Sequence, residues 1–196
     1  IDLHSSSLIC PVCKHDNTVD AITTKTMMAQ MADKLYSFKH CLYCGSVFLK
    51  HPVDQGEIDR YYPSWYLPFR GADAWGKYSF IVKATENVQD KKRVKKCLKY
   101  FDKHKKINVL DIGCGKPSFL AQLDKRTSWN LTGIDFKITN WQQAQVYKDL
   151  ELIDGELENT TFDKKFDLIT MWHYLEHDYQ PDKTLARIEK LLNPGG

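Results

Sequence analysis

The chain has 196 residues, a net charge of +3, and 42% hydrophobic and 27% charged residues. This length suits one ordinary domain with a small extra module, and the composition excludes a disordered chain. No apolar run approaches the roughly 18 residues that a membrane span needs, and the polar start lacks a signal-peptide core. We therefore expect a cytoplasmic protein without a membrane span. The small charge by itself gives no argument for a polyanionic partner.

The first segment, residues 1–52, contains two C-x-x-C pairs, Cys10 with Cys13 and Cys41 with Cys44. In a chain without export signals this spacing predicts a metal site rather than disulfides, because two such knuckles can place four thiolates around one zinc ion. Alternating residues on both sides of the second pair predict a hairpin. The pairs lie 27 residues apart, so we expect a further short element between them. The alternative is four buried or redox-active cysteines.

Residues 53–78 are rich in tyrosine, proline and glycine, which predicts an irregular linker. Its aromatic side chains either seal the seam between two modules or form a lid over a binding site, and the two interpretations are compatible. Residues 79–104 predict a helix with an apolar stripe, around which many lysines lie. These lysines are either the solvated face of an amphipathic helix or a patch for nucleic acid.

From residue 107 onward the pattern alternates between strand and helix. It predicts strands at 107–112, 130–135, 149–153 and 166–172, and helices at 117–125, at 140–147 and from residue 181. This order is typical of an α/β fold with a doubly wound, Rossmann-like parallel sheet. We assign residues 79–196 to this domain.

The chain is organised around residues 109–120, VLDIGCGKPSFL, where a strand ends in an acid and a turn with G-x-G spacing follows. Gly113 and Gly115 allow the backbone to approach a ligand where a Cβ atom would collide. Pro117 fits the first turn of a helix, because its missing N–H costs nothing there. The segment therefore predicts a cofactor-sized notch at the carboxyl end of a strand.

Two acids narrow the choice of cofactor. Asp135 ends the second strand, 20 residues after Gly115, where a carboxylate accepts hydrogen bonds from ribose hydroxyls. That position fits NAD as well as S-adenosylmethionine. However, the sixth place of the dinucleotide motif is Ser118, and Asp111 would repel a pyrophosphate. A carboxylate suits the ammonium and sulfonium of S-adenosylmethionine better.

Residues 107–196 resemble class I S-adenosylmethionine-dependent methyltransferases. The resemblance is carried in chain order by VLDIGCG, LTGIDF, DGELENTTF with KFDLITM, WHYLEH, and LARIEKLLNPGG. It implies a cofactor site made by Asp111, Gly113, Cys114, Gly115, Asp135, Phe136, Glu156 and Leu157. In that site the glycine segment holds the methionine end and Asp135 the ribose. Glu156, or alternatively Asp154, lies near the adenine amino group.

The sequence departs from this family at two points. Pro117 stands where the family commonly has a third glycine, which puts the fit of the methionine tail in question. The family's sheet has seven strands, whereas this chain ends before a fifth, so we expect an incomplete domain that lacks the last strands and part of the acceptor site.

The segment after the fourth strand contains H-x-x-E-H, formed by His173, Glu176 and His177. A histidine here can serve as the general base for a hydroxyl or amine acceptor. Alternatively, the Glu-His pair organises the loop, or the residues bind a metal, since small-RNA 2′-O-methyltransferases have a similar E-x-x-E-H motif.

The residues and the resemblance together predict a methyltransferase with S-adenosylmethionine as cofactor and a structural zinc ion. We expect a small-molecule acceptor, such as a sugar or a lipid- or polysaccharide-linked precursor, because a zinc ribbon before a Tyr-Tyr-Pro linker resembles bacterial methyltransferases of that kind. One alternative is an RNA methyltransferase that uses the ribbon and the lysine-rich helix to bind RNA. Another is a non-catalytic binding module.

Overall fold

The structure is a computed structural model that describes residues 8–26, 34–61, 72–136, 141 and 144–196. The chain divides into two compact units, residues 1–61 with 178–183, and residues 62–177 with 184–196. The predicted aromatic lid lies largely at residues 62–71, outside the described residues. Part of the helix predicted at 140–147 also lies outside them.

The first unit is built on a three-stranded antiparallel sheet in the order β1-β2-β3. Its elements are β1 (Thr18–Lys25), β2 (Leu35–Cys41), β3 (Val47–Leu49), the 3-10 helix η2 (Gln55–Glu57) and α1 (Ile58–Tyr61). Strands β2 and β3 form the hairpin predicted around the second cysteine pair, with Phe38 opposite Leu49. Strand β1 is the additional element in the long interval between the pairs.

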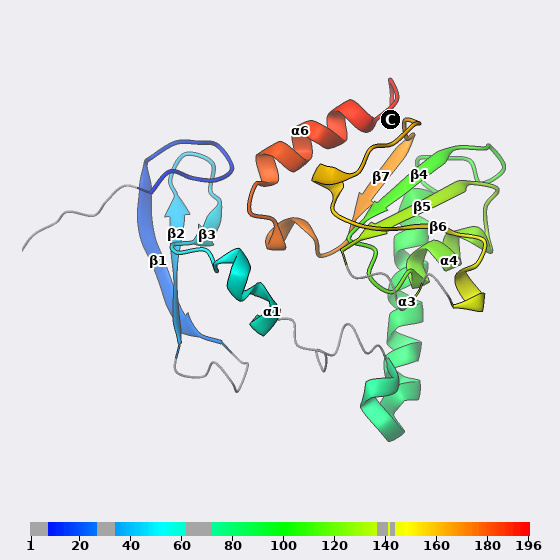
Figure 1. The fold of residues 1–196 in the computed structure, drawn as a ribbon, viewed down its shortest axis with the longest axis horizontal. Helices are drawn as coiled ribbons and strands as arrows, with labels where there is room; N and C mark the ends of the chain where they lie inside the picture. Colours follow the sequence, from blue (N-terminus) through cyan, green and yellow to red (C-terminus); the bar gives the residue numbers. More distant parts are fainter. Residues whose placement is uncertain (1–7, 27–33, 62–71, 137–140, 142–143) are drawn as a thin grey trace, which may run out of the picture. The chain divides into compact units, whose positions relative to one another are not determined.

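The second unit is an α/β domain around a parallel sheet in the order β6-β5-β4-β7 (Figure 1). Its elements are η3 (Ala72–Tyr78), α3 (Ser79–Cys97), β4 (Asn108–Ile112), α4 (Ser118–Asp124), β5 (Asn130–Asp135), η4 (Gln145–Tyr147), β6 (Glu151–Asp154), η5 (Leu157–Asn159), β7 (Leu168–Met171), η6 (Leu175–His177) and α6 (Pro181–Leu191). The predicted doubly wound parallel sheet is confirmed.

Strand β4 lies between β5 and β7 in the sheet, and this position indicates where a ligand binds. It pairs in parallel with β5 on one side and with β7 on the other, so that Asp111 lies between Gly133 and Thr170. The chain runs from β4 outward to β5 and β6, and then crosses to the opposite side for β7. The crevice outside the carboxyl ends of β4 and β7 is therefore a topological switch point, where open α/β sheets bind their ligands.

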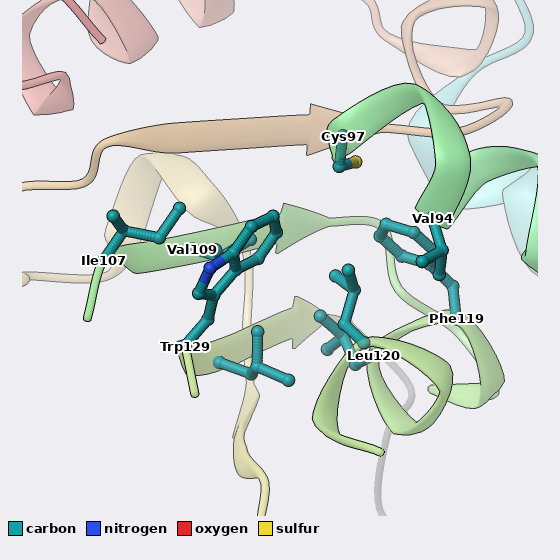
Figure 2. Close-up of a cluster of buried hydrophobic side chains, with 9 residues drawn as sticks. Val94, Cys97, Ile107, Val109, Phe119, Leu120 and Trp129 are labelled. Atoms are coloured by element: carbon teal, nitrogen blue, oxygen red, sulfur yellow. The ribbon is translucent and has the colours of Figure 1, made fainter. Parts of the chain in front are cut away.

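The core lies on both faces of the sheet. On one face, Val109 of β4 packs with apolar residues of α3 and α4, and Trp129 closes the cluster (Figure 2). On the other face, Leu110 and Ile112 pack with Ile188 of α6. Val109 and Leu110 are both fully buried, and burial of each stabilises the fold by roughly 1.5–3 kcal/mol. An apolar run that is buried on both faces is the signature of a parallel strand.

Beyond shifts of one or two residues at the strand ends, three predicted helices differ from the structure. Helix α3 ends at Cys97 rather than near residue 104 and is followed by a turn. The predicted helix at 140–147 is replaced, in its described part, mainly by the short 3-10 helix η4. Helix α4 begins at Ser118, so Pro117 is its N-cap residue rather than its first helical residue. Of the described helices, none combines the length and apolarity that crossing a membrane requires.

Candidate functional site

The turn after β4 has a backbone that only glycine adopts without strain. Gly113 has a φ of 68° and Gly115 a φ of 46°, both in the left-handed region. A Cβ atom on Gly113 would lie 2.5 Å from Cδ2 of Tyr174, so the space is closed as well. The Gly113 N–H donates to the carbonyl of Ile134 at the end of β5, over 2.9 Å. This hydrogen bond fixes the turn to the carboxyl end of β5.

Asp111 is a carboxylate buried beneath this turn. It is 3% exposed and accepts a hydrogen bond of 2.6 Å from the Thr170 hydroxyl of β7. Loss of hydration raises its pKa from the usual 3.8 to about 7, although the Thr170 hydrogen bond and the positive charge of Arg93 oppose the shift. A buried carboxylate with so costly a charge favours the approach of a cationic group.

Asp135 lies at the end of β5, next to the turn. Its Oδ2 accepts the Gly115 N–H over 2.9 Å, which couples the second-strand acid to the glycine turn. Phe136 follows and is 49% exposed, so its ring is available to a ligand. Cys114 is half-buried, and burial raises the pKa of its thiol, so it acts here as a small apolar group.

The predicted adenine-side segment lies beside Asp135. The Gly155 N–H donates to the Asp135 carbonyl over 3.0 Å, which holds the start of this segment against β5. Glu156 is exposed and accepts a 3.0 Å hydrogen bond from the Asn159 side-chain amide. Leu157 is 2% exposed and anchors the segment in the core. The segment therefore has a fixed apolar base and a solvent-facing carboxylate.

The H-x-x-E-H segment follows β7 directly. His173 has a φ of 57°, which is unusual for a residue other than glycine and marks local backbone strain. Its Nδ1 lies 3.4 Å from Oε1 of Glu176, and both side chains are exposed. His177 ends the 3-10 helix η6 and is exposed as well. The contact of His173 with Glu176 brings two of the three residues of the motif together.

A buried polar group on α3 was not predicted from the sequence. Asp90 is 3% exposed, accepts a 2.6 Å hydrogen bond from the Ser118 hydroxyl, and lies 3.2 Å from the Arg93 guanidinium. It falls on the same helical stripe as Val94 and Cys97. The sequence gives one indication of this buried group, since Asp90 is a charged residue within the apolar stripe of the helix.

Arg93 extends from this group toward the end of β7. Its guanidinium lies 5.0 Å from the ring centre of Trp172, which also packs edge-to-face on Phe119. The Trp172 indole nitrogen is buried and lacks a hydrogen-bond partner among the described residues. These contacts beside the end of β7 were not predicted from the sequence.

The four cysteines of the first unit converge as a metal site requires. Their sulfur atoms all lie within 4.8 Å of one another, with Cys10 and Cys44 3.7 Å apart and Cys13 and Cys41 3.5 Å apart. Four thiolates at about 2.3 Å from a tetrahedral zinc ion would be roughly 3.8 Å apart. The observed donor set and spacing fit that geometry and suggest a structural zinc site.

Comparison with known proteins identifies a domain that covers more than half of the chain. Residues 85–196 match the family model described as "Methyltransferase domain". The ubiquinone biosynthesis O-methyltransferase of Neisseria meningitidis serogroup A is 26% identical over 158 residues, which are 75% of this chain and 61% of the relative. The protein of the same name from Thiobacillus denitrificans is 30% identical over 95 residues, 45% of this chain and 40% of the relative.

A solved structure from Methanococcus maripaludis, described as an S-adenosyl-L-methionine-dependent methyltransferase, has a similar fold. Its TM-score is 0.52 at 18% identity, and the match covers 65% of this chain and 60% of that one. This likeness supports the Rossmann-like architecture of the second unit. The chain spans between 40% and 61% of the length of the curated relatives it matches.

Proposed function

The chain belongs to the methyltransferase domain family, and from this premise we propose that it transfers a methyl group from S-adenosylmethionine to a small-molecule acceptor. The observation that carries the proposal is the buried carboxylate of Asp111 beneath a glycine turn at the switch point of the sheet. A cation bound beside Asp111 would be stabilised by the negative charge of the carboxylate, which burial otherwise makes unfavourable.

The residues present fit this cofactor better than a dinucleotide. S-adenosylmethionine carries an ammonium and a sulfonium, whereas a pyrophosphate would meet the negative charge of Asp111 at close range. Gly115 leaves room for close approach to the backbone, because no heavy atom lies nearer than 4.0 Å to the place of its missing Cβ. Because the pKa of Asp111 is about 7, a cation beside it would displace its proton in neutral solution and gain a full countercharge.

The remaining cofactor residues follow from their places along the edge of the sheet. Asp135 would accept hydrogen bonds from the ribose while it also fixes the Gly115 N–H. Glu156, with Asp154 as the alternative, would accept from the adenine amino group. Leu157 beneath and Phe136 beside it would supply apolar contact for the base.

The acceptor side would use His173. The names of the relatives specify O-methylation, so we propose that the acceptor is a hydroxyl group. Nδ1 of His173 faces Glu176, which leaves Nε2 to take the hydroxyl proton as the oxygen attacks. The cofactor supplies a methyl group that the positive sulfur has already activated. The hydroxyl oxygen would take this methyl group, S-adenosylhomocysteine would leave, and His173 would hold the proton that the hydroxyl releases.

The zinc ion would have a structural role in the first unit. Four thiolates close a tetrahedral site and leave no position for substrate or water. Among the described apolar residues of this unit only Cys10 and Cys41 are buried, so the ion would supply stability that its small core lacks.

Calorimetric titration of the purified chain with S-adenosylhomocysteine and with NAD tests the cofactor assignment. We expect binding of the first ligand only. The variant Asp135→Asn should weaken binding by about tenfold, since a charged hydrogen-bond acceptor is worth roughly 1.5–3 kcal/mol. Asp124→Asn, which alters an exposed acid of α4, should leave the affinity unchanged. Absence of S-adenosylhomocysteine binding, or tighter binding of NAD, would refute the assignment.

A labelled-methyl assay tests the acceptor class once binding is established. Incubation with S-adenosylmethionine carrying a labelled methyl group, and with nucleotide sugars or phenols as acceptors, should transfer the label to a hydroxyl oxygen. Transfer to nitrogen or carbon only would contradict the O-methylation proposal while leaving the cofactor assignment intact.

A further inference from the structure

The first half of helix α3 carries three exposed apolar side chains among exposed polar ones such as Lys83, Thr85 and Asn87. Phe80 is 67% exposed, Ile81 50% and Val88 51%. Ile81 and Val88 are seven residues apart and so lie on one side of the helix, opposite the buried Asp90 and Cys97. An amphipathic helix of a globular domain usually presents polar residues here. The described residues of the domain leave these apolar side chains uncovered.

The same solvent face becomes basic along its second half. Lys92 and Lys95 are exposed and follow Val88 at the spacings of one and two helical turns, and Lys91 lies beside them. Ahead of the helix, Trp75 and Tyr78 of η3 are 45% and 53% exposed. We name the set formed by these exposed residues the α3 face; it consists of Trp75, Tyr78, Phe80, Ile81, Val88, Lys91, Lys92 and Lys95.

Helix α3 contacts the glycine turn on the side opposite the α3 face, because Glu86 lies five residues after Ile81 and two before Val88. The Lys116 ammonium, in the turn after β4, lies 3.1 Å from Glu86 of α3. Residues of α3 before Glu86 therefore extend beyond the carboxyl edge of the sheet, by about 1.5 Å per residue. Figure 1 shows this end of the helix projecting past the strands.

We propose that the α3 face docks the protein on the surface of an anionic lipid membrane. Aromatic and aliphatic side chains can enter the headgroup region, while the lysines lie near lipid phosphates, each worth about 1 kcal/mol. The helix lies in the plane of the surface, as interfacial amphipathic helices do.

The apolar residues distinguish this partner from nucleic acid. Single-stranded nucleic acid binds through backbone charges and through bases stacked on aromatic rings. Exposed aliphatic side chains such as Ile81 and Val88 gain nothing from that mode, whereas burial in the interfacial region is worth about 25 cal/mol per Å² of apolar surface. The inference goes beyond the proposed function and does not depend on the identity of the cofactor.

Sedimentation with lipid vesicles tests the proposal. The full chain should bind vesicles of phosphatidylcholine mixed with phosphatidylglycerol, and bind vesicles of phosphatidylcholine alone at least about tenfold more weakly. Binding should fall with added salt, because exposed charges are screened. Two double variants, Ile81→Ser with Val88→Ser and Lys92→Glu with Lys95→Glu, should each reduce binding about tenfold or more.

Two matched controls change similar residues away from the α3 face. Tyr100→Ser removes an aromatic ring that is 81% exposed, and Lys125→Glu reverses an exposed charge after α4. Both should bind vesicles like the wild type. S-adenosylhomocysteine affinity of all variants should stay unchanged, which separates loss of docking from loss of fold.

Three outcomes overturn the proposal. The first is an absence of binding to the phosphatidylglycerol vesicles. The second is equal binding by the double variants and the controls. The third is tighter binding to single-stranded RNA, lost with the lysine variant and kept with the apolar variant, which would assign the face to nucleic acid.

Discussion

Replacing Asp111 with asparagine should make the protein more stable and at the same time unable to bind its cofactor. The asparagine side chain has the same shape and retains an oxygen that can accept the Thr170 hydroxyl. It carries no charge, so the cost of a buried carboxylate disappears. A ligand with an ammonium and a sulfonium loses its countercharge in the same step.

The size of the effect follows from the pKa of Asp111, which burial raises from 3.8 to about 7. Below pH 4 both the folded and the unfolded chain hold the proton, so the charge has no effect. Between pH 4 and 7 the unfolded chain releases a proton that the folded protein keeps, and wild-type stability falls as the pH rises. The full loss is about 4 kcal/mol above pH 7, since one pKa unit corresponds to about 1.36 kcal/mol.

Urea denaturation followed by circular dichroism measures the effect at pH 5 and pH 8. The difference in free energy of unfolding between Asp111→Asn and wild type should grow by roughly 2.5 kcal/mol between the two pH values, in favour of the variant. Titration with S-adenosylhomocysteine should show at least a hundredfold loss of affinity in the variant. A variant that is less stable than wild type at pH 8, or a difference that is constant with pH, would refute the reasoning.

Other substitutions test the base, the glycine turn and the metal site. Asparagine tolerates the positive φ of residue 173, so His173→Asn should keep the local backbone. This variant should lower kcat by about 10²–10⁴ without changing the affinity for the cofactor. A change in cofactor affinity alone would exclude a role for His173 as general base. Gly113→Ala should abolish cofactor binding and lower the free energy of unfolding by about 2–4 kcal/mol, because the new Cβ is strained and collides with Tyr174. The control Gly45→Ala also has a positive φ, but its Cβ would enter open space, so cofactor affinity should stay intact. Elemental analysis should find one zinc ion per chain in the wild type and in Cys97→Ala, and none in Cys10→Ser; equal zinc content in the two variants would argue against the site.

The strands and the glycine turn could be predicted because their signals are local. Strands β4 and β5 are short, largely apolar runs that end before Gly113 and at Asp135. The placement of β5 at residues 130–135 was predicted to the residue. The short helix η4 was mistaken for a longer one, because its segment lacks an apolar stripe that would distinguish the two.

Several contacts near the glycine turn could not be predicted, because they join distant parts of the chain. Tyr174 lies against Gly113 although the two residues are far apart in sequence, and nothing near either residue indicates the contact. Asp90 meets Ser118 from another helix, 28 residues away. A pattern shows that a residue will be buried, whereas its partner is decided only by how the elements pack.

Pro117 shows how packing changes the meaning of a departure from a motif. In the sequence it stands where a third glycine is common, and a larger residue there would be expected to crowd the cofactor. In the structure its side chain is fully buried at the start of α4, so it takes no open space from the notch. The residues on either side are tied to α3, Lys116 through Glu86 and Ser118 through Asp90. Proline here restricts the backbone between two anchored neighbours, so the turn gains rigidity at a position where glycine would add freedom to the unfolded chain.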